Sequence, residues 1–213
     1  MNFKKQWGLW LGLLIVVGFS LLALTSNRGP IGVPLSVPGV VAGEHVKGNP
    51  DAKAILIGYG DFQCPACAAY EPLLNRLSEE FPNDLAMVFR HFPLRTIHPN
   101  ANVAAYASEA ADKQGKFWEM HDLLYAKQID WEKAGDPKSM FAIYAVQLGL
   151  NKDQFVADMN SDAIKAKIDA DYTMANRIGL TGTPTFFLNG KQLMQNPSSY
   201  EAFKALIEAE IQK

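Results

Sequence analysis

The sequence predicts an α/β domain whose sheet is interrupted by an all-α insertion, preceded by an N-terminal transmembrane helix. Three observations support this prediction: β-rich runs occur early and late in the chain, a long helical block separates them, and an uncharged apolar run opens the sequence. Strands that alternate with helices are typical of α/β domains. The chain has 213 residues, 48% of them hydrophobic, which suits one globular domain with a sizeable core.

Residues 1–24 are predicted to form the membrane anchor. Lys4 and Lys5 precede an uncharged run over residues 7–24, which at about 1.5 Å per residue comes close to spanning a hydrocarbon core of about 30 Å. The two lysines favour a single-pass topology with a cytoplasmic N-terminus and the rest of the chain on the periplasmic or extracellular side. A cleaved signal peptide is the alternative, although its apolar core usually has only roughly 7–15 residues.

Residues 25–43 read as a linker, and the folded domain is expected over residues 44–213. Pro30, Pro34 and Pro38 recur in the linker among glycines and small residues, a composition that favours extended conformations. The net charge of −2 excludes a nucleic-acid partner, because phosphate binding needs clustered lysine and arginine.

The domain is expected to begin with a strand, a helix and a second strand. Residues 54–59 form a short apolar run that fits a buried strand. A helix follows, with Pro65 in its first turn, where a missing N–H costs nothing. Residues 85–92 alternate well enough for the second strand. This order predicts a parallel crossover connection.

The helical insertion is predicted over about residues 97–178. Within it, Asp136, Pro137 and Gly149 supply helix start and stop signals in the expected order. Ser161 is predicted to cap a further helix.

A hairpin and a last helix are expected to complete the domain. Two β-rich runs, residues 185–188 and 191–195, are joined by Asn-Gly at 189–190, the strongest two-residue hairpin signal. Ser198 and Glu201 stand in a capping-box arrangement and predict the start of the final helix.

Both cysteines of the chain, Cys64 and Cys67, lie in the sequence CPAC at the start of the first predicted helix. Unsatisfied backbone N–H groups and the helix dipole stabilise a thiolate at this position, so Cys64 is the predicted nucleophile. Cys67 lies about one turn further in and is the predicted resolving thiol.

Two other interpretations of the cysteine pair are weaker. A zinc site would need two further ligands, and the four histidines show no finger-like spacing. A structural disulfide would close a very small loop, for which the gain in loop entropy is smallest. We therefore expect no metal, and no cofactor besides a redox-active Cys64–Cys67 disulfide.

Four motifs in this order resemble the DsbA-like branch of the thioredoxin superfamily, and its membrane-anchored bacterial members in particular. They are YGDFQCPAC, FRHFPL, QGKFWEMHDLLY and GLTGTPTFFLNG. The resemblance begins near Val46, covers about four fifths of the chain and excludes the anchor and linker. It implies a thioredoxin-like fold with a helical insertion.

The resemblance also implies which residues form the site. Pro184 is expected to be cis and to face the cysteines, while Thr183 would bind the substrate chain through backbone hydrogen bonds, a form of strand addition. Pro65 and Ala66 complete the active-site motif. Strongly oxidising relatives carry Pro-His between the cysteines, so the absence of an imidazole at Ala66 predicts a lower redox potential than theirs.

One departure from the resembled family concerns proton handling. Many relatives carry a buried glutamate about six positions before the first cysteine, where this chain has Gly58. Water or another group must then handle the proton, with Asp61 as a candidate that could equally act as a local cap. Three histidines and three apolar residues are also expected to be structural, namely His91, His98, His121, Phe117, Trp118 and Met120.

The predicted function is that of an exported, membrane-tethered thiol–disulfide oxidoreductase acting on folding exported proteins that contain cysteines. The disulfide-forming direction is favoured, and the resemblance implies reoxidation by a quinone-linked membrane protein. Two alternatives stay open: a reductase or isomerase that uses the same residues, and a non-catalytic exported peptide-binding or chaperone module.

Overall fold

The computed structural model describes residue 37 and residues 39–213. The predicted anchor at 1–24 and most of the predicted linker at 25–43 lie outside the described residues. Within the described part, no helix is both long enough and apolar enough to cross a membrane.

A five-stranded mixed sheet forms the centre of the domain, in the order β1-β3-β2-β4-β5. β2 and β3 are parallel, and the other neighbouring strands are antiparallel. The predicted crossover connection is therefore present. The strands are β1 (His45–Gly48), β2 (Ala54–Gly60), β3 (Leu85–His91), β4 (Thr185–Leu188) and β5 (Lys191–Gln192).

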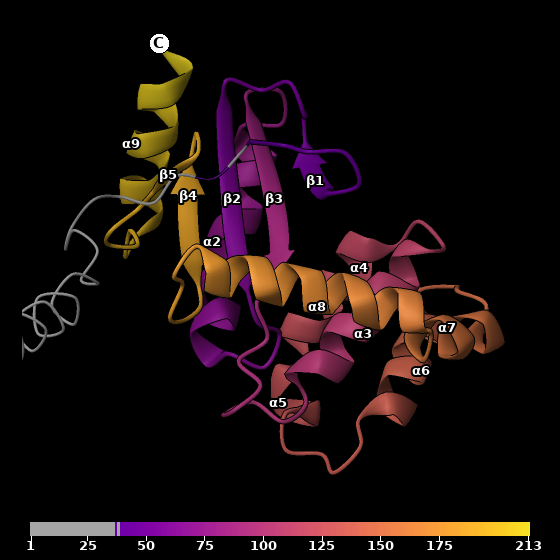
Figure 1. The fold of residues 1–213 in the computed structure, drawn as a ribbon. Coiled ribbons are helices and arrows are strands. Elements are labelled where there is room, and N and C mark those ends of the chain that lie inside the picture. Colours follow the sequence, from indigo (N-terminus) through magenta and orange to yellow (C-terminus); the bar gives the residue numbers. More distant parts are fainter. Residues whose placement is uncertain (1–36, 38) are drawn as a thin grey trace, which may run out of the picture. The chain divides into compact units, whose positions relative to one another are not determined.

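Helix α2 (Pro65–Glu80) connects β2 to β3, and α9 (Tyr200–Ile211) ends the chain. Both pack on the face of the sheet that Leu56 presents, whereas its neighbour Ile57 faces the opposite side, as the two-residue period of a strand requires. Figure 1 shows α2 and α9 behind the strands.

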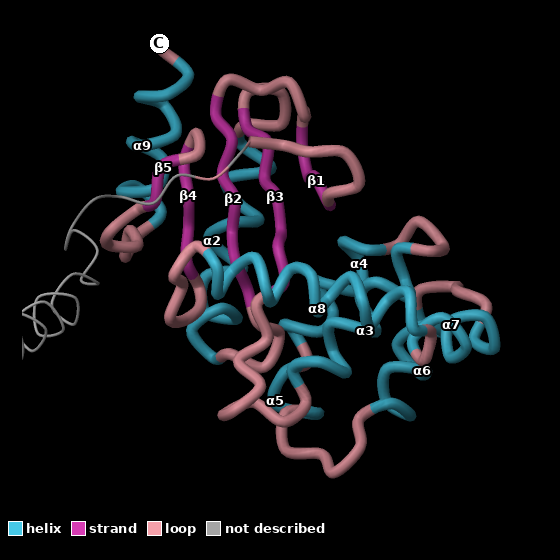
Figure 2. The backbone as a smooth tube through the Cα atoms, viewed as in Figure 1, coloured by secondary structure: helices cyan, strands magenta, loops and turns pink. Residues whose placement is uncertain are grey.

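The helical insertion occupies the chain between β3 and β4. Figures 1 and 2 show its helices gathered beyond one end of the strands, with α8 running across that end of the sheet. The helices are α3 (Ala101–Asp112), α4 (Phe117–Ala126), α5 (Gln128–Trp131), α6 (Lys138–Gln147), α7 (Lys152–Met159) and α8 (Asp162–Arg177).

Several local predictions hold. Asn189 (φ 46°) and Gly190 (φ 78°) both adopt positive φ between β4 and β5, as a type I′ hairpin turn requires. The Ser161 side chain caps α8 by accepting from the Ile164 N–H. Gly149 (φ 75°) follows α6, where a glycine readily takes the left-handed conformation.

Other boundaries were wrong by a few residues. β5 ends at Gln192, short of the predicted 195. Ser199, not Ser198, caps the last helix and accepts from the Ala202 N–H at 3.2 Å, because two adjacent serines carry the same capping signal. Pro137 rather than Asp136 is the N-cap residue of α6.

Strand β1 was not predicted. It has only four residues, and they include a buried histidine and a half-buried lysine, so it lacks the apolar alternation that marks a strand. Its pairing with β3 places His45 against the insertion.

Candidate active site

Cys64 is the N-cap residue of α2, with extended backbone angles (φ −76°, ψ 118°), and Pro65 follows in the first turn. The Cys64 N–H donates to the Asp61 carbonyl at 3.0 Å, which fixes the loop that leads into the helix. Cys64 and Cys67 are unbonded thiols and both are buried, 6% and 3% exposed respectively.

The two thiols have opposite pKa shifts. The pKa of Cys64 is lowered to about 5, mainly by a hydrogen bond with Cys67; burial opposes this shift, and Thr183 and the backbone of Cys67 and Ala66 add to it. Burial raises the pKa of Cys67 well above its ordinary value, and the neighbouring Cys64 raises it further. A thiolate at Cys64 beside a protonated Cys67 is the division of roles expected for a nucleophile and a resolving thiol.

The segment Gly182-Thr183-Pro184 reaches this helix end from the far end of the chain. The Thr183–Pro184 bond is cis, and the Cys64 thiol donates to the Thr183 carbonyl at 3.5 Å. The Asn196 side-chain amide donates to the Pro184 carbonyl at 2.8 Å and holds the segment in place. The structure thus brings Thr183 and Pro184 to the cysteines.

Asp61 is buried and its carboxylate is fully engaged. Oδ1 accepts from the Gln63 N–H at 2.8 Å, and Oδ2 accepts from the Leu94 N–H at 2.8 Å and from His98 Nδ1 at 2.7 Å. These bonds tie the active-site loop to the segment after β3. The arrangement favours a structural role, in which Asp61 holds the loop and does not cap α2, over the proton-handling role that the sequence also allowed.

Two glutamines that the sequence did not single out hold the same loop to the insertion. Gln128 on α5 donates through Nε2 to the carbonyls of Phe62 (2.7 Å) and Cys64 (3.1 Å). Gln63 donates to the Glu132 carbonyl at 2.7 Å and accepts from the Asn100 N–H at 2.7 Å. Glutamine has no distinctive sequence signal, so only the fold identifies these contacts.

A small cavity lies behind the cysteines. Its volume is about 40 Å³, and its lining includes Cys67, Pro184, Glu71 and Tyr125. At Gly58, an added Cβ would lie 3.2 Å from the Phe186 ring. The strand position is therefore crowded by an aromatic side chain, and the carboxyl group that lines the cavity comes from α2.

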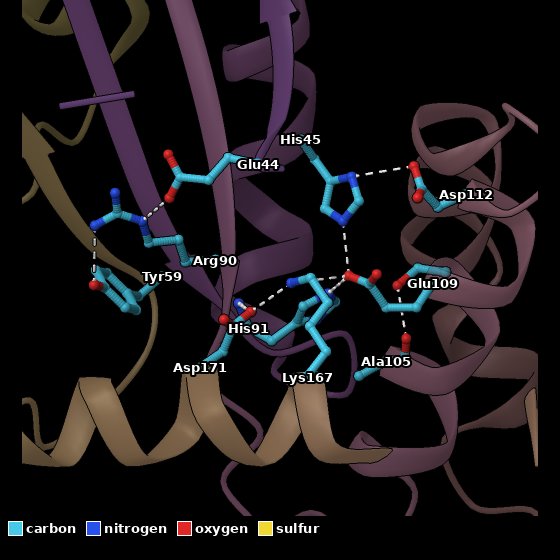
Figure 3. A network of polar contacts seen from close by, with 11 residues as sticks. Glu44, His45, Tyr59, Arg90, His91, Ala105, Glu109, Asp112, Lys167 and Asp171 are labelled. Atoms are coloured by element: carbon cyan, nitrogen blue, oxygen red, sulfur yellow. Dashed lines mark hydrogen bonds and ion pairs between the residues drawn. The ribbon is translucent and has the colours of Figure 1, made fainter. Parts of the chain in front are cut away.

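The other histidines belong to two histidine–carboxylate clusters. In the first, which we call the Glu109 cluster (His45, His91, Glu109 and Lys167), Glu109 Oε1 accepts from the Nε2 atoms of His45 (2.7 Å) and His91 (2.8 Å) and pairs with Lys167 Nζ at 3.2 Å. Figure 3 shows Glu109 reached from both sides by these groups. Although burial alone would raise it, the pKa of Glu109 is held well below its usual range by the two histidines.

The second group, the Glu71 cluster (Glu71, His121 and Asp122), borders the cavity. His121 Nδ1 donates to Asp122 Oδ1 at 2.8 Å, while His121 Nε2 lies 3.9 Å from Glu71 Oε1. Burial raises the pKa of Glu71, against a lowering effect of His121. The prediction that Phe117 and Met120 are core residues agrees with their burial, and Trp118 is partly buried against the same core.

Comparison with known proteins places this architecture. The family model described as thioredoxin matches residues 41–209. Oxidised BdbD from Bacillus subtilis superposes with a TM-score of 0.74 at 22% identity, covering 85% of this chain and 100% of that one. DsbA2 from Pseudomonas aeruginosa gives a TM-score of 0.59 at 25% identity, covering 79% of this chain and 97% of the other.

Similarity also extends to much longer proteins. The Na(+)/H(+) antiporter NhaA 1 of Mycolicibacterium gilvum is 38% identical over 185 residues, which is 84% of this chain but 29% of that relative. The chain thus spans less than a third of the length of such curated relatives. The family match over most of the chain, the cis-proline segment and the paired cysteines lead to one conclusion: the chain belongs to the thioredoxin family.

Proposed function

We propose that the chain forms disulfides in exported proteins, with Cys64 as the attacked sulfur and Cys67 as the leaving and resolving thiol. The observation that carries this proposal is the lowered pKa of Cys64, about 5, at the N-terminus of α2. A stabilised thiolate favours the reduced protein, and favouring the reduced form makes the disulfide form the stronger oxidant.

In the proposed reaction a substrate thiolate attacks Cys64 Sγ and forms a mixed disulfide, while the Cys64–Cys67 bond breaks and Cys67 leaves with the electron pair. A second substrate thiolate attacks the mixed disulfide and releases Cys64 as a thiolate. The substrate gains a disulfide and loses two electrons, which the cysteine pair holds. Thr183 and Pro184, next to Cys64, would bind the substrate backbone as an added strand.

Reoxidation completes the cycle in this proposal, with a quinone-linked membrane protein as the electron acceptor. A tether through residues 1–24, with the domain on the periplasmic or extracellular side, would keep the domain near that acceptor. Lys4 and Lys5 before an apolar run support the orientation. Alkaline extraction of membranes from cells that express the chain with and without residues 1–24 tests the tether.

The redox equilibrium of the full chain against glutathione buffers tests the direction of exchange. A midpoint well above about −200 mV supports the oxidase, and a midpoint near −270 mV supports a reductase instead. The pKa of Cys64 lies between those of strong oxidants, about 3.5, and thioredoxin, about 7, so we expect a midpoint between their potentials. If Cys64→Ser retains full function in cells, both the oxidase and the reductase interpretations are wrong, and a non-catalytic binding module is supported instead.

A further inference from the structure

Cys67 needs a proton partner in the exchange reaction, and this inference rests on the proposed function. Whenever the Cys64–Cys67 bond opens, Cys67 leaves as a thiolate in a buried setting where burial disfavours its charge. Whenever the bond closes, the Cys67 thiol must first lose its proton. A group near Cys67 that gives and takes a proton would speed both directions.

The two sequence positions first considered for this role are not suited to it. Gly58 has no side chain, and the space beside it is occupied by the Phe186 ring, 3.2 Å from where a Cβ would stand. Both carboxylate oxygens of Asp61 already accept hydrogen bonds, Oδ1 from the active-site loop and Oδ2 from the segment after β3.

Glu71 has the position that these two lack. It follows Cys67 by four residues on α2, so both side chains lie on the same face of that helix. Both line the cavity of about 40 Å³, which has room for a water molecule that could bridge the thiol and the carboxyl group. The Glu71 side chain is 13% exposed, so its carboxyl group can also exchange protons with solvent.

The groups around Glu71 leave its carboxyl group free to titrate. From α4, His121 Nε2 lies 3.9 Å away and is not within hydrogen-bonding distance, and Asp122 adds a second negative charge. Lys47 on β1 pairs with Asp122, and its positive charge lowers the pKa of Glu71 to a smaller extent. Burial raises the pKa of Glu71, so the pKa of this carboxyl group lies closer to that of a thiol than the pKa of an exposed glutamate does.

Tyr125 supplies a second polar group to the cavity. Its hydroxyl is buried and has no hydrogen-bond partner among the described residues. Its pKa is raised by burial and by the nearby charges of Cys67 and Glu71, so the hydroxyl lies within electrostatic range of both. An unpartnered buried hydroxyl in this place can hold a bridging water by donating to it.

We propose that the Glu71 carboxyl group exchanges a proton with the Cys67 thiol across this cavity during disulfide exchange. On closure, Cys67 gives its proton to the Glu71 carboxylate and attacks Cys64 Sγ, and the substrate sulfur bound there leaves as a thiolate with the electron pair. On opening, Cys67 leaves as a thiolate and takes the proton back from Glu71. The carboxyl group ends each full cycle unchanged.

Single-turnover oxidation of the reduced full chain by glutathione disulfide separates the steps. Cys64 first attacks glutathione disulfide at a rate proportional to its concentration and releases one glutathione. Cys67 then closes the disulfide at a rate independent of that concentration and releases the second glutathione. Acid quenching and mass spectrometry count the glutathione adduct between pH 4 and 9.

In Glu71→Gln we expect closure to slow by roughly 100-fold near neutral pH, with the attack by Cys64 unchanged. Glu79→Gln is the matched control, because Glu79 is exposed on the same helix. Acetate in the buffer should accelerate closure in Glu71→Ala by replacing the lost carboxyl group, which a purely structural role would not allow.

Closure in Glu71→Gln at the native rate and with the native pH profile would overturn the proposal. So would a slow Glu71→Ala that acetate fails to accelerate. A different failure, in which the native chain itself forms no Cys64–Cys67 disulfide with glutathione disulfide, would instead remove the proposed function.

Discussion

The Glu109 cluster and the Glu71 cluster are both histidine–carboxylate groups that include residues of the helical insertion, yet their two glutamates have different partners. Glu109 accepts from two histidines and pairs with Lys167, whereas the nearest basic side chain to Glu71 is His121, whose Nε2 lies 3.9 Å from Glu71 Oε1. The pKa of Glu109 is lowered and that of Glu71 is raised. The Glu109 carboxylate, which has three close partners, holds the fold. The Glu71 carboxyl group, which has no partner within hydrogen-bonding distance among the described residues, is available for proton transfer.

The positions of the clusters agree with this division. The Glu109 cluster joins β1, β3, α3 and α8 and so ties the insertion to the sheet. The Glu71 cluster joins α2 to α4 beside the cavity that Cys67 lines. Glu109 thus has a structural role, and Glu71 has the proposed role in proton transfer.

The largest expected effect is the loss of stability in Glu109→Gln. Removing the charge of Glu109 weakens its two buried hydrogen bonds with histidines and leaves Asp171 as the remaining partner of Lys167, at a cost of about 1.5–3 kcal/mol. Urea denaturation should show this loss while the glutathione midpoint stays near the native value. Asp112→Asn, on the same helix and 41% exposed, is the control and should change stability little. A stable Glu109→Gln would contradict the structural role of the cluster.

The two carboxylates should also respond oppositely to pH. A lowered pKa means that Glu109 stabilises the fold above the unfolded value, near 4.5, and that this stability is lost as pH falls below it. A raised pKa means that Glu71 costs stability as pH rises above about 4.5. We therefore expect Glu71→Gln to be at least as stable as the native chain at pH 7, with a change below about 1 kcal/mol. Denaturation midpoints of both variants at pH 4 and pH 7 check this contrast.

Cys64 should titrate independently of both clusters. Its pKa of about 5 is lowered mainly by the hydrogen bond with Cys67, against burial, with smaller contributions from Thr183 and the backbone of Ala66. The rate of iodoacetamide alkylation of reduced Cys64 should rise through a midpoint near pH 5 and then level off. The midpoint should stay within about half a pH unit in Glu71→Gln and Glu109→Gln. A midpoint above pH 8 would show that the thiolate is not stabilised.

The smallest effect is expected for Tyr125→Phe. The Tyr125 hydroxyl is buried without a partner among the described residues, so its removal should leave stability within about 1 kcal/mol of the native value or raise it. Disulfide closure should slow by a few fold if the hydroxyl holds the bridging water. Urea denaturation and the glutathione disulfide assay measure the two effects separately. A large loss of stability would show that the hydroxyl has a structural partner.

Local sequence signals pointed to Cys64 and Cys67 as the reactive pair, and the resemblance to a known family pointed to the segment around Pro184. Cys64 and Cys67 lie within one helical turn, and Asn189-Gly190 fixes a turn by itself, so neighbouring residues carry enough information for both. The boundary error at Ser198 arose because the adjacent Ser199 carries the same capping signal. Strand β1 was missed because its pairing with β3, not its own composition, makes it a strand.

The sequence by itself therefore determined the family, the cysteine pair and the order of the main elements, because helix ends, hairpins and thiolate stabilisation depend on residues close together in the chain. Only the tertiary structure decided which carboxylates have close hydrogen-bond and ion-pair partners. Glu109 meets His45 across 64 positions of the sequence, and Cys64 meets Thr183 across 119. Burial and long-range pairing set the pKa of a carboxyl group, and neither exists until the chain has folded.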